Sequence, residues 1–195
     1  MSRGQLGPGR HPIDMSEYAR DTAALDSSVV MAAAGDRVAF ARLVDAYHAD
    51  TMRVAYVVAG GDREIAEDAV QAAWAIAWQK LASLRDPERL KPWLLTVTAN
   101  EARQAARRRH RHPVVELDVA AADPASRDPS SLVSELDLHR ALVHFAPEDR
   151  ALLALRYVAG FDSTEIAALT HKNASSVRSR LAALLARLRK ELSDD

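Results

Sequence analysis

Apolar residues recur at helical spacing through most of this chain, which restricts it to folds built from packed helices. From Phe40 onward an apolar stripe follows offsets of 0, 3, 4, 7, 11, 14, 15 and 18, the pattern of one face of a long helix. A second stripe runs from about Arg63 to Leu84, where we expect Trp74 and Trp78 to face the core. No segment suggests a strand. The sequence therefore predicts an all-α protein.

A third helix is predicted from Trp93 to His112, apolar where it begins and cationic where it ends. Glu101 is the only acidic residue in this span, so it cannot neutralise the five guanidinium groups that lie within nine residues. Such surplus charge is typical of a surface that binds phosphate. The alternative is a solvated helix end, because arginines at a carboxyl terminus also favour the helix dipole. The five residues are Arg103, Arg107, Arg108, Arg109 and Arg111.

Charge divides the chain into two mildly basic blocks and an acidic connector. Residues 36–112 carry 13 basic and 10 acidic residues, residues 113–137 carry one and 6, and residues 138–195 carry 9 and 7. The connector contains three prolines and no sustained periodicity, so we expect a flexible linker that lets two small helical domains move independently. Residues 1–35 are predicted to form a disordered or partly helical extension.

The last block has the pattern of a helix-turn-helix. Pro147 suits the first position of a helix, and Asp162 with Glu165 forms a capping-box signature for a short one. After a turn at residues 170–172, Asn173 is placed to cap a final helix whose serines and arginines lie opposite an apolar stripe. We predict that this face enters a DNA major groove. An ordinary helical hairpin with solvated arginines is the alternative.

Composition and spacing exclude several chemistries. The chain has no cysteine, hence no disulfide, no thiolate zinc site and no cysteine nucleophile. His110 and His112 lie among arginines, a poor setting for a cationic metal, and the acids at 67–68 and 148–149 are adjacent rather than facing. We predict no catalytic residue, no metal and no cofactor, and so no enzyme. Without an apolar run of about 20 residues or a signal peptide, we expect a cytoplasmic protein with no membrane span.

Several segments resemble the extracytoplasmic function (ECF) sigma factors, the group IV sigma factors of bacterial RNA polymerase. They are AEDAVQAAWAIAW at 66–78, KPWLLTVTANEARQAARRR at 91–109, and PEDRALLALRY with EIAALTHKNASSVRSRL in the last block. The resemblance covers about residues 36–112 and 138–192. It implies a promoter-melting region 2 at 36–112, a linker at 113–137 and a helix-turn-helix region 4 at 138–195. The implied function is to join core polymerase, recognise a promoter and promote its melting.

The resemblance also implies roles for individual residues. Asp68 and Gln71 match positions that bind the clamp helices of the polymerase β′ subunit. The loop from Arg85 to Lys91 matches the segment that holds a base flipped from the minus-ten element. The residues implied in minus-ten binding are Arg85, Lys91, Trp93, Asn100, Arg103, Arg107 and Arg108. Those implied in reading the minus-thirty-five element are Lys172, Asn173, Ser175, Ser176, Arg178, Ser179 and Arg180.

Several positions depart from the family pattern. Ala72 follows Gln71 where an acidic residue is common, and Thr170, His171 and Lys172 replace the leucine, glycine and aliphatic residue usual in the turn. The implied partners are core polymerase, through the β′ clamp helices and the β flap, promoter DNA, and an anti-sigma factor. Two alternatives remain: a stand-alone helix-turn-helix regulator, and a sigma-like interaction protein without promoter activity.

Overall fold

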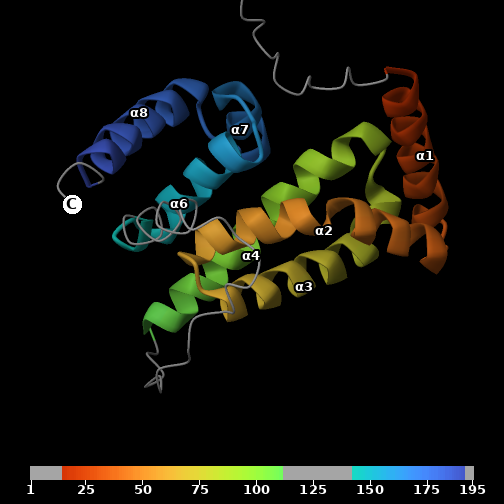
Figure 1. The fold of residues 1–195 in the computed structure, drawn as a ribbon, viewed down its shortest axis with the longest axis horizontal. Helices are drawn as coiled ribbons and strands as arrows, with labels where there is room; N and C mark the ends of the chain where they lie inside the picture. Colours follow the sequence, from red (N-terminus) through yellow and green to blue (C-terminus); the bar gives the residue numbers. More distant parts are fainter. Residues whose placement is uncertain (1–14, 112–141, 192–195) are drawn as a thin grey trace, which may run out of the picture.

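The computed structural model describes residues 15–111 and 142–191, and every regular element in these ranges is helical (Figure 1). The all-α prediction is confirmed for this part of the chain. None of its helices is long and apolar enough to cross a membrane. The elements are α1 Met15–Ala33, α2 Arg37–Ala59, α3 Arg63–Lys80, the 3-10 turns η1 Leu81–Ser83 and η2 Pro87–Arg89, α4 Leu90–Arg111, α6 Pro147–Leu153, the π-helical turn η3 Ala154–Val158, α7 Ser163–Thr170 and α8 Ala174–Glu191.

The first block is a bundle of α2, α3 and α4, in which α2 and α3 begin at side-chain caps. Asp36 accepts hydrogen bonds from the backbone N–H groups of Val38 and Ala39 at 2.8 and 3.1 Å, and Asp62 accepts one from Ile65 at 3.0 Å. These carboxylates satisfy N–H groups that have no partner inside the helix. The apolar stripes of the three helices then meet in one buried core.

The two tryptophans of α3 differ in burial. Trp74 is buried at 8% exposure, whereas Trp78 is 40% exposed, so the prediction that Trp78 faces the core is wrong. The physical reason is its position: Ala77 is the last buried residue of α3, and Trp78 lies just past this stripe. Its ring packs edge-on against Phe40, with centroids 4.9 Å apart.

Helix α1 lies within the extension for which we expected disorder or partial helix. Its residues Val29 and Ala32 are buried, and the helix packs against α2 and the turns η1 and η2 (Figure 1). Residues 1–14 and 112–141 lie outside the described residues, and the second of these ranges contains the whole acidic linker predicted at 113–137.

The second block forms the predicted helix-turn-helix. Pro147 occupies the first turn of α6, and Asp162 and Glu165 form a complete capping box at the start of α7. The turn to α8 places His171 in the left-handed region, at φ 54°, a conformation that glycine adopts more freely than other residues.

The two blocks pack against each other, although the linker composition led us to expect independent movement. Helix α6 and η3 lie against α2 and α4, and Leu152, Leu153 and Leu155 belong to the same apolar core as α2 and α4 (Figure 1). A block of a few short helices leaves part of its apolar surface uncovered, and burying that surface on a neighbouring bundle is favourable.

Candidate nucleic-acid and polymerase interfaces

The outer face of α3 carries the residues expected to bind polymerase. Asp68 and Gln71 are both exposed, because Ile65, Ala69 and Ala73 turn the opposite side of the helix into the core. Trp78 lies seven residues, or about two turns, after Gln71 and therefore shares this face. Trp78 was not expected on the surface, although its position at the very end of the apolar stripe was a signal.

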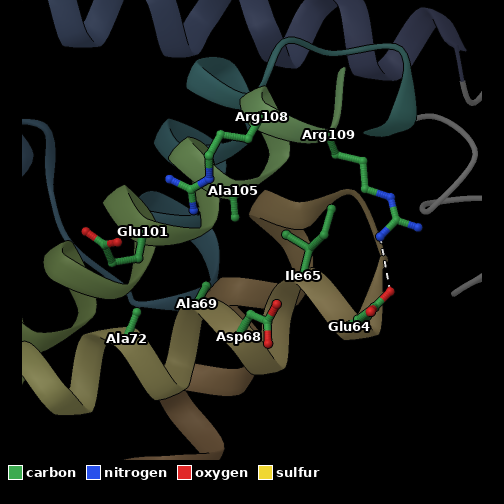
Figure 2. A pocket seen from close by; sticks show the side chains of 9 residues that line it. All are labelled: Glu64, Ile65, Asp68, Ala69, Ala72, Glu101, Ala105, Arg108 and Arg109. Carbon is green, nitrogen blue, oxygen red and sulfur yellow. Dashed lines mark hydrogen bonds and ion pairs between the residues drawn. The ribbon is translucent and has the colours of Figure 1, made fainter. Parts of the chain in front are cut away.

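An open groove of about 320 Å³ lies between α3 and α4 (Figure 2). Asp68 from α3 and Arg108 from α4 both line it. At one end Arg109 reaches across to α3, with Nη1 3.1 Å from Oε2 of Glu64 and Nε 3.8 Å from Oδ2 of Asp62. Arg109 thus joins the end of α4 to the start of α3. Across the described ranges, no group of three or more residues that could hold a metal is found.

The beginning of α4 holds one of the predicted minus-ten residues in an ion pair. Nζ of Lys91 lies 2.7 Å from Oδ2 of Asp50 and 5.9 Å from the ring centroid of Tyr47. Burial raises the pKa of Asp50, but hydrogen bonds from Lys91 and Arg53 outweigh this and leave the pKa below its ordinary value. The ion pair with Asp50 therefore links Lys91, at the start of α4, to α2.

Three other predicted minus-ten residues, in the loop before α4 and in the first half of that helix, differ in exposure. Arg85 and Asn100 are exposed, whereas Trp93 is half-buried against the core. The structure thus leaves Arg85 and Asn100 open to solvent, while Trp93 contributes both to the bundle and to its surface.

The arginines at the end of α4 have different surroundings. Arg108 is exposed, and Arg107 is half-exposed and forms an ion pair with Glu148 of α6. Arg103 is half-buried, and its Nε finds no hydrogen-bond acceptor among the described residues. Two of the five guanidinium groups predicted to be surplus, those of Arg107 and Arg109, therefore pair with carboxylates of the protein itself. The side chain of Arg111 lies outside the described residues.

Helix α8 presents the predicted recognition face. Val177, Leu181 and Leu184 are buried, and all seven residues expected to read DNA are exposed. Asn173 caps the helix as predicted, since its Oδ1 accepts hydrogen bonds from the backbone N and from Oγ of Ser175 at 2.8 and 2.7 Å. Three of these seven residues, Ser175, Ser176 and Ser179, have small side chains, which permit close approach to a base edge.

Arg180 differs from its neighbours on this face. Its Nε and Nη2 donate to the two carboxylate oxygens of Asp149 on α6, at 2.8 and 2.7 Å, and Asp149 is only 5% exposed. The hydrogen bonds and charge of Asp149 raise the pKa of Arg180 above its ordinary value. Its guanidinium joins α6 to α8. Arg178 on the same helix instead donates from Nε to the carbonyl oxygen of Ala174 in the preceding turn, at 3.4 Å.

Comparison with known proteins shows which family the chain resembles. The models for Sigma-70 region 2 and for Sigma-70, region 4 match residues 43–112 and 135–188. The chain is 32% identical over 169 residues to the probable RNA polymerase sigma factor RfaY of Xanthomonas campestris pv. campestris, a match covering 83% of this chain and 42% of that protein. It therefore spans less than half of the length of RfaY.

In two further comparisons the aligned region covers most of this chain and most of the protein compared with it. The chain is 27% identical over 155 residues to the ECF RNA polymerase sigma factor SigM of Mycobacterium tuberculosis, covering 80% of this chain and 78% of SigM. The structure of the sigma factor RpoE in complex with the anti-sigma factor NepR from Bartonella quintana aligns with a TM-score of 0.64 and 26% identity, over 80% of this chain and 98% of RpoE. The two region models span more than half of the chain, and it belongs to the sigma-70 family, as an ECF sigma factor.

Proposed function

We propose that this chain directs transcription initiation by joining core RNA polymerase, binding a two-part promoter and promoting the melting of its minus-ten element. The observation that carries the proposal is the presence of two exposed cationic helical surfaces on one chain, at Arg108 on α4 and at Arg178 on α8. Two separate DNA-binding surfaces suit two separate promoter elements. Core RNA polymerase, which sigma factors join, would hold both DNA-binding surfaces against one duplex.

Polymerase docking is assigned to the outer face of α3. Asp68 and Gln71 offer a carboxylate and an amide to the β′ clamp helices, and Trp78 adds an apolar anchor on the same face. An exposed aromatic ring is a favourable centre for a protein interface, because it buries a large area at small conformational cost. This anchor offsets the missing acidic residue at Ala72. The β flap is assigned as a second contact of region 4.

Promoter melting is assigned to the loop around Arg85 and to the exposed side of α4. Extracting a base from the duplex costs a few kcal/mol, which contacts to the flipped base and to the backbone offset. Asn100 offers an amide for hydrogen bonding, and Arg107 and Arg108 offer charge to phosphates. Opening by this route uses the free energy of binding, and the chain acts as an initiation factor rather than as a catalyst.

Reading of the minus-thirty-five element is assigned to α8. Ser175, Ser176 and Ser179 are small enough for the helix to approach the major groove, and Arg178 can reach a guanine edge or a phosphate. Because Asp149 holds Arg180, that arginine serves the region 4 fold more than base reading. An anti-sigma factor is proposed as a further partner, by analogy with the complex of RpoE and NepR.

The decisive experiment is run-off transcription by reconstituted holoenzyme on genomic fragments, with start sites mapped. We expect initiation at discrete sites that core polymerase alone does not use. Copurification with core enzyme in equal amount is the companion measurement. Duplex binding without polymerase association would instead support a stand-alone regulator, and polymerase association without initiation would support an interaction protein that lacks promoter activity.

A further inference from the structure

The turn between α7 and α8 contains a residue whose backbone conformation is strained. Within residues 15–111 and 142–191, His171 is the one residue other than glycine that has a positive φ, at 54° with ψ 39°. Glycine adopts this left-handed conformation freely, whereas a side chain brings Cβ close to the backbone and raises the free energy of the folded state. Strain that persists in a structure points to a functional role for the residue that bears it.

No contact of the His171 side chain within the described residues offsets this strain. The imidazole is exposed, and no hydrogen bond or ion pair of its ring is found in residues 15–111 and 142–191. The turn is held by the backbone, because the N–H groups of His171 and Lys172 both donate to the carbonyl oxygen of Ala167, the second at 2.9 Å. Such bonds end a helix in a left-handed residue without needing a particular side chain. The fold therefore does not account for histidine at this position.

The charge around His171 is suited to a phosphate. Residues 166–190, from the middle of α7 to near the end of α8, contain six lysines and arginines and no acidic residue. His171 comes directly before Lys172, which is also exposed, and α8 begins at Ala174. A basic stretch without acidic residues attracts the backbone of a nucleic acid. The imidazole thus lies in a segment that favours an anion.

Several donors at the start of α8 are engaged within the protein. Oγ of Ser175 donates to Oδ1 of Asn173 at 2.7 Å. The guanidinium of Arg180 donates to both carboxylate oxygens of Asp149. These donors are therefore less free for DNA, whereas the exposed imidazole of His171 lies just before them in the chain. A neutral imidazole has one N–H donor and a protonated imidazole has two, so His171 can donate to a phosphate oxygen in either state.

We propose that His171 is a further DNA-binding residue, whose imidazole donates a hydrogen bond to a backbone phosphate beside the minus-thirty-five element. The inference rests on the proposed function for the entry of α8 into the major groove of that element. A recognition helix contacts bases with its amino-terminal residues, so the turn immediately before it lies near the rim of the groove, where the phosphates are. Such a contact adds affinity and fixes the position of the helix without reading sequence.

The test compares His171→Gly with His144→Gly in the full-length chain, assembled with core polymerase on a promoter found by start-site mapping. His144 is also an exposed histidine of the second block, and its carbonyl oxygen accepts a hydrogen bond from Nη2 of Arg187 at 2.9 Å. At about 1.5 Å per residue, Arg187 lies about 20 Å along α8 from its start at Ala174. His144 therefore lies toward the other end of α8 from the turn. Urea unfolding of each chain measures stability, and titration of fluorescent promoter DNA with each holoenzyme measures affinity.

We expect His171→Gly to raise the urea midpoint, because the strain at φ 54° is relieved, and to weaken promoter binding about three- to ten-fold. His144→Gly is expected to leave promoter affinity unchanged. A purely structural role for His171 predicts the gain in stability without the loss of affinity. His171→Asn is the rescue variant, because asparagine accepts the left-handed conformation and carries an amide donor. Its promoter affinity should lie between those of the unmutated chain and His171→Gly.

Replacing single backbone phosphates of the promoter by neutral methylphosphonates identifies the phosphate concerned. At one or two positions beside the minus-thirty-five element, the replacement should weaken binding of the unmutated chain more than binding of His171→Gly, which already lacks the hydrogen bond. Equal weakening of both proteins at every position, or equal promoter affinity of the unmutated chain and His171→Gly, would overturn the inference. A holoenzyme with the unmutated chain that initiates at no discrete site would instead overturn the proposed function, on which the inference rests.

Discussion

Arg178 and Arg180 lie two positions apart on α8 but have different surroundings, and this predicts different consequences of replacement. Arg180→Ala leaves the buried carboxylate of Asp149 without its two charged donors, so we expect the free energy of unfolding to fall by about 1–3 kcal/mol. Arg178→Ala removes an exposed side chain, and we expect a stability change within about 0.5 kcal/mol. Urea unfolding measures both values.

Arg178→Ala and Arg180→Ala are also expected to differ in their effect on DNA binding. Arg178→Ala is expected to weaken holoenzyme binding at the minus-thirty-five element by about 1–3 kcal/mol if it reads a base, without loss of stability. The reverse result, with a destabilised Arg178 variant and a stable Arg180 variant, would show that the pair with Asp149 is not what holds α6 to α8.

Hydrogen bonds between residues that are close in sequence were predictable, whereas ion pairs between residues far apart in sequence were not. Asn173 and the capping box of α7 depend on side chains that reach backbone groups two or three positions away, so spacing alone identifies them. Asp149 and Arg180 are separated by 31 positions, and Glu148 and Arg107 lie on different blocks. Such pairs depend on how helices pack, which a single sequence does not encode in any short pattern.

At the scale of one element, the cap of α7 predicts a dependence on pH. Asp162 accepts hydrogen bonds from the N–H groups of Glu165 and Thr164, and these hold its pKa below the ordinary value of 3.8. A carboxylate with a lowered pKa stabilises the folded state above pH 3.8, and this contribution is lost as the pH falls through the lowered pKa. We expect α7 to lose helicity in that range.

Asp162→Asn is the matched variant for this prediction, because asparagine also caps helices but does not titrate. Its α7 should keep the same helicity across the acid range, apart from the effects of other carboxylates. Amide chemical shifts of residues 163–170 follow the helix directly. An equal acid transition in the Asp162→Asn variant would show that titration of the cap is not the cause.

The end of α4 predicts a specific change in salt dependence. Arg107→Ala with Arg108→Ala should reduce the slope of log affinity against log salt by about 1 for each phosphate that is no longer neutralised, in the holoenzyme complex with promoter DNA. Arg109→Ala is the control, because Glu64 and Asp62 already hold that guanidinium. Titration of fluorescent promoter DNA at several salt concentrations measures the slope. Equal slopes in the double variant and the control would remove Arg107 and Arg108 from the DNA interface.

Helices with strong apolar periodicity were predicted at the right places in the chain, whereas their first and last residues were off by a few positions. The helix predicted from Trp93 begins at Leu90 in the structure, since Pro92 fits within a first turn. Trp78 matched the period of its helix, yet its ring lies at the edge of the core, where it contacts Phe40 of α2 and stays 40% exposed. The period of a stripe shows which face is apolar, whereas the length over which that face is buried depends on the neighbouring elements.

At the scale of the whole molecule, the charged connector suggested two separate domains, whereas the structure joins them through a common core. Apolar residues of α6 and η3 look in sequence like the core of their own block. Whether they bury against that block or its neighbour depends on shapes that appear only when both are folded. A chain with this arrangement should behave as one cooperative unit when it is free of polymerase.

Leu155→Ala tests that expectation, because all three tryptophans, Trp74, Trp78 and Trp93, lie in the first block while Leu155 lies in the second. Leu155 is 2% exposed, so its truncation should lower the free energy of unfolding by about 2–5 kcal/mol. If the core is shared, the urea midpoint seen by tryptophan fluorescence shifts together with the midpoint seen by circular dichroism. A fluorescence midpoint equal to that of the unmutated chain would mean that the first block unfolds alone and that the common core contributes little.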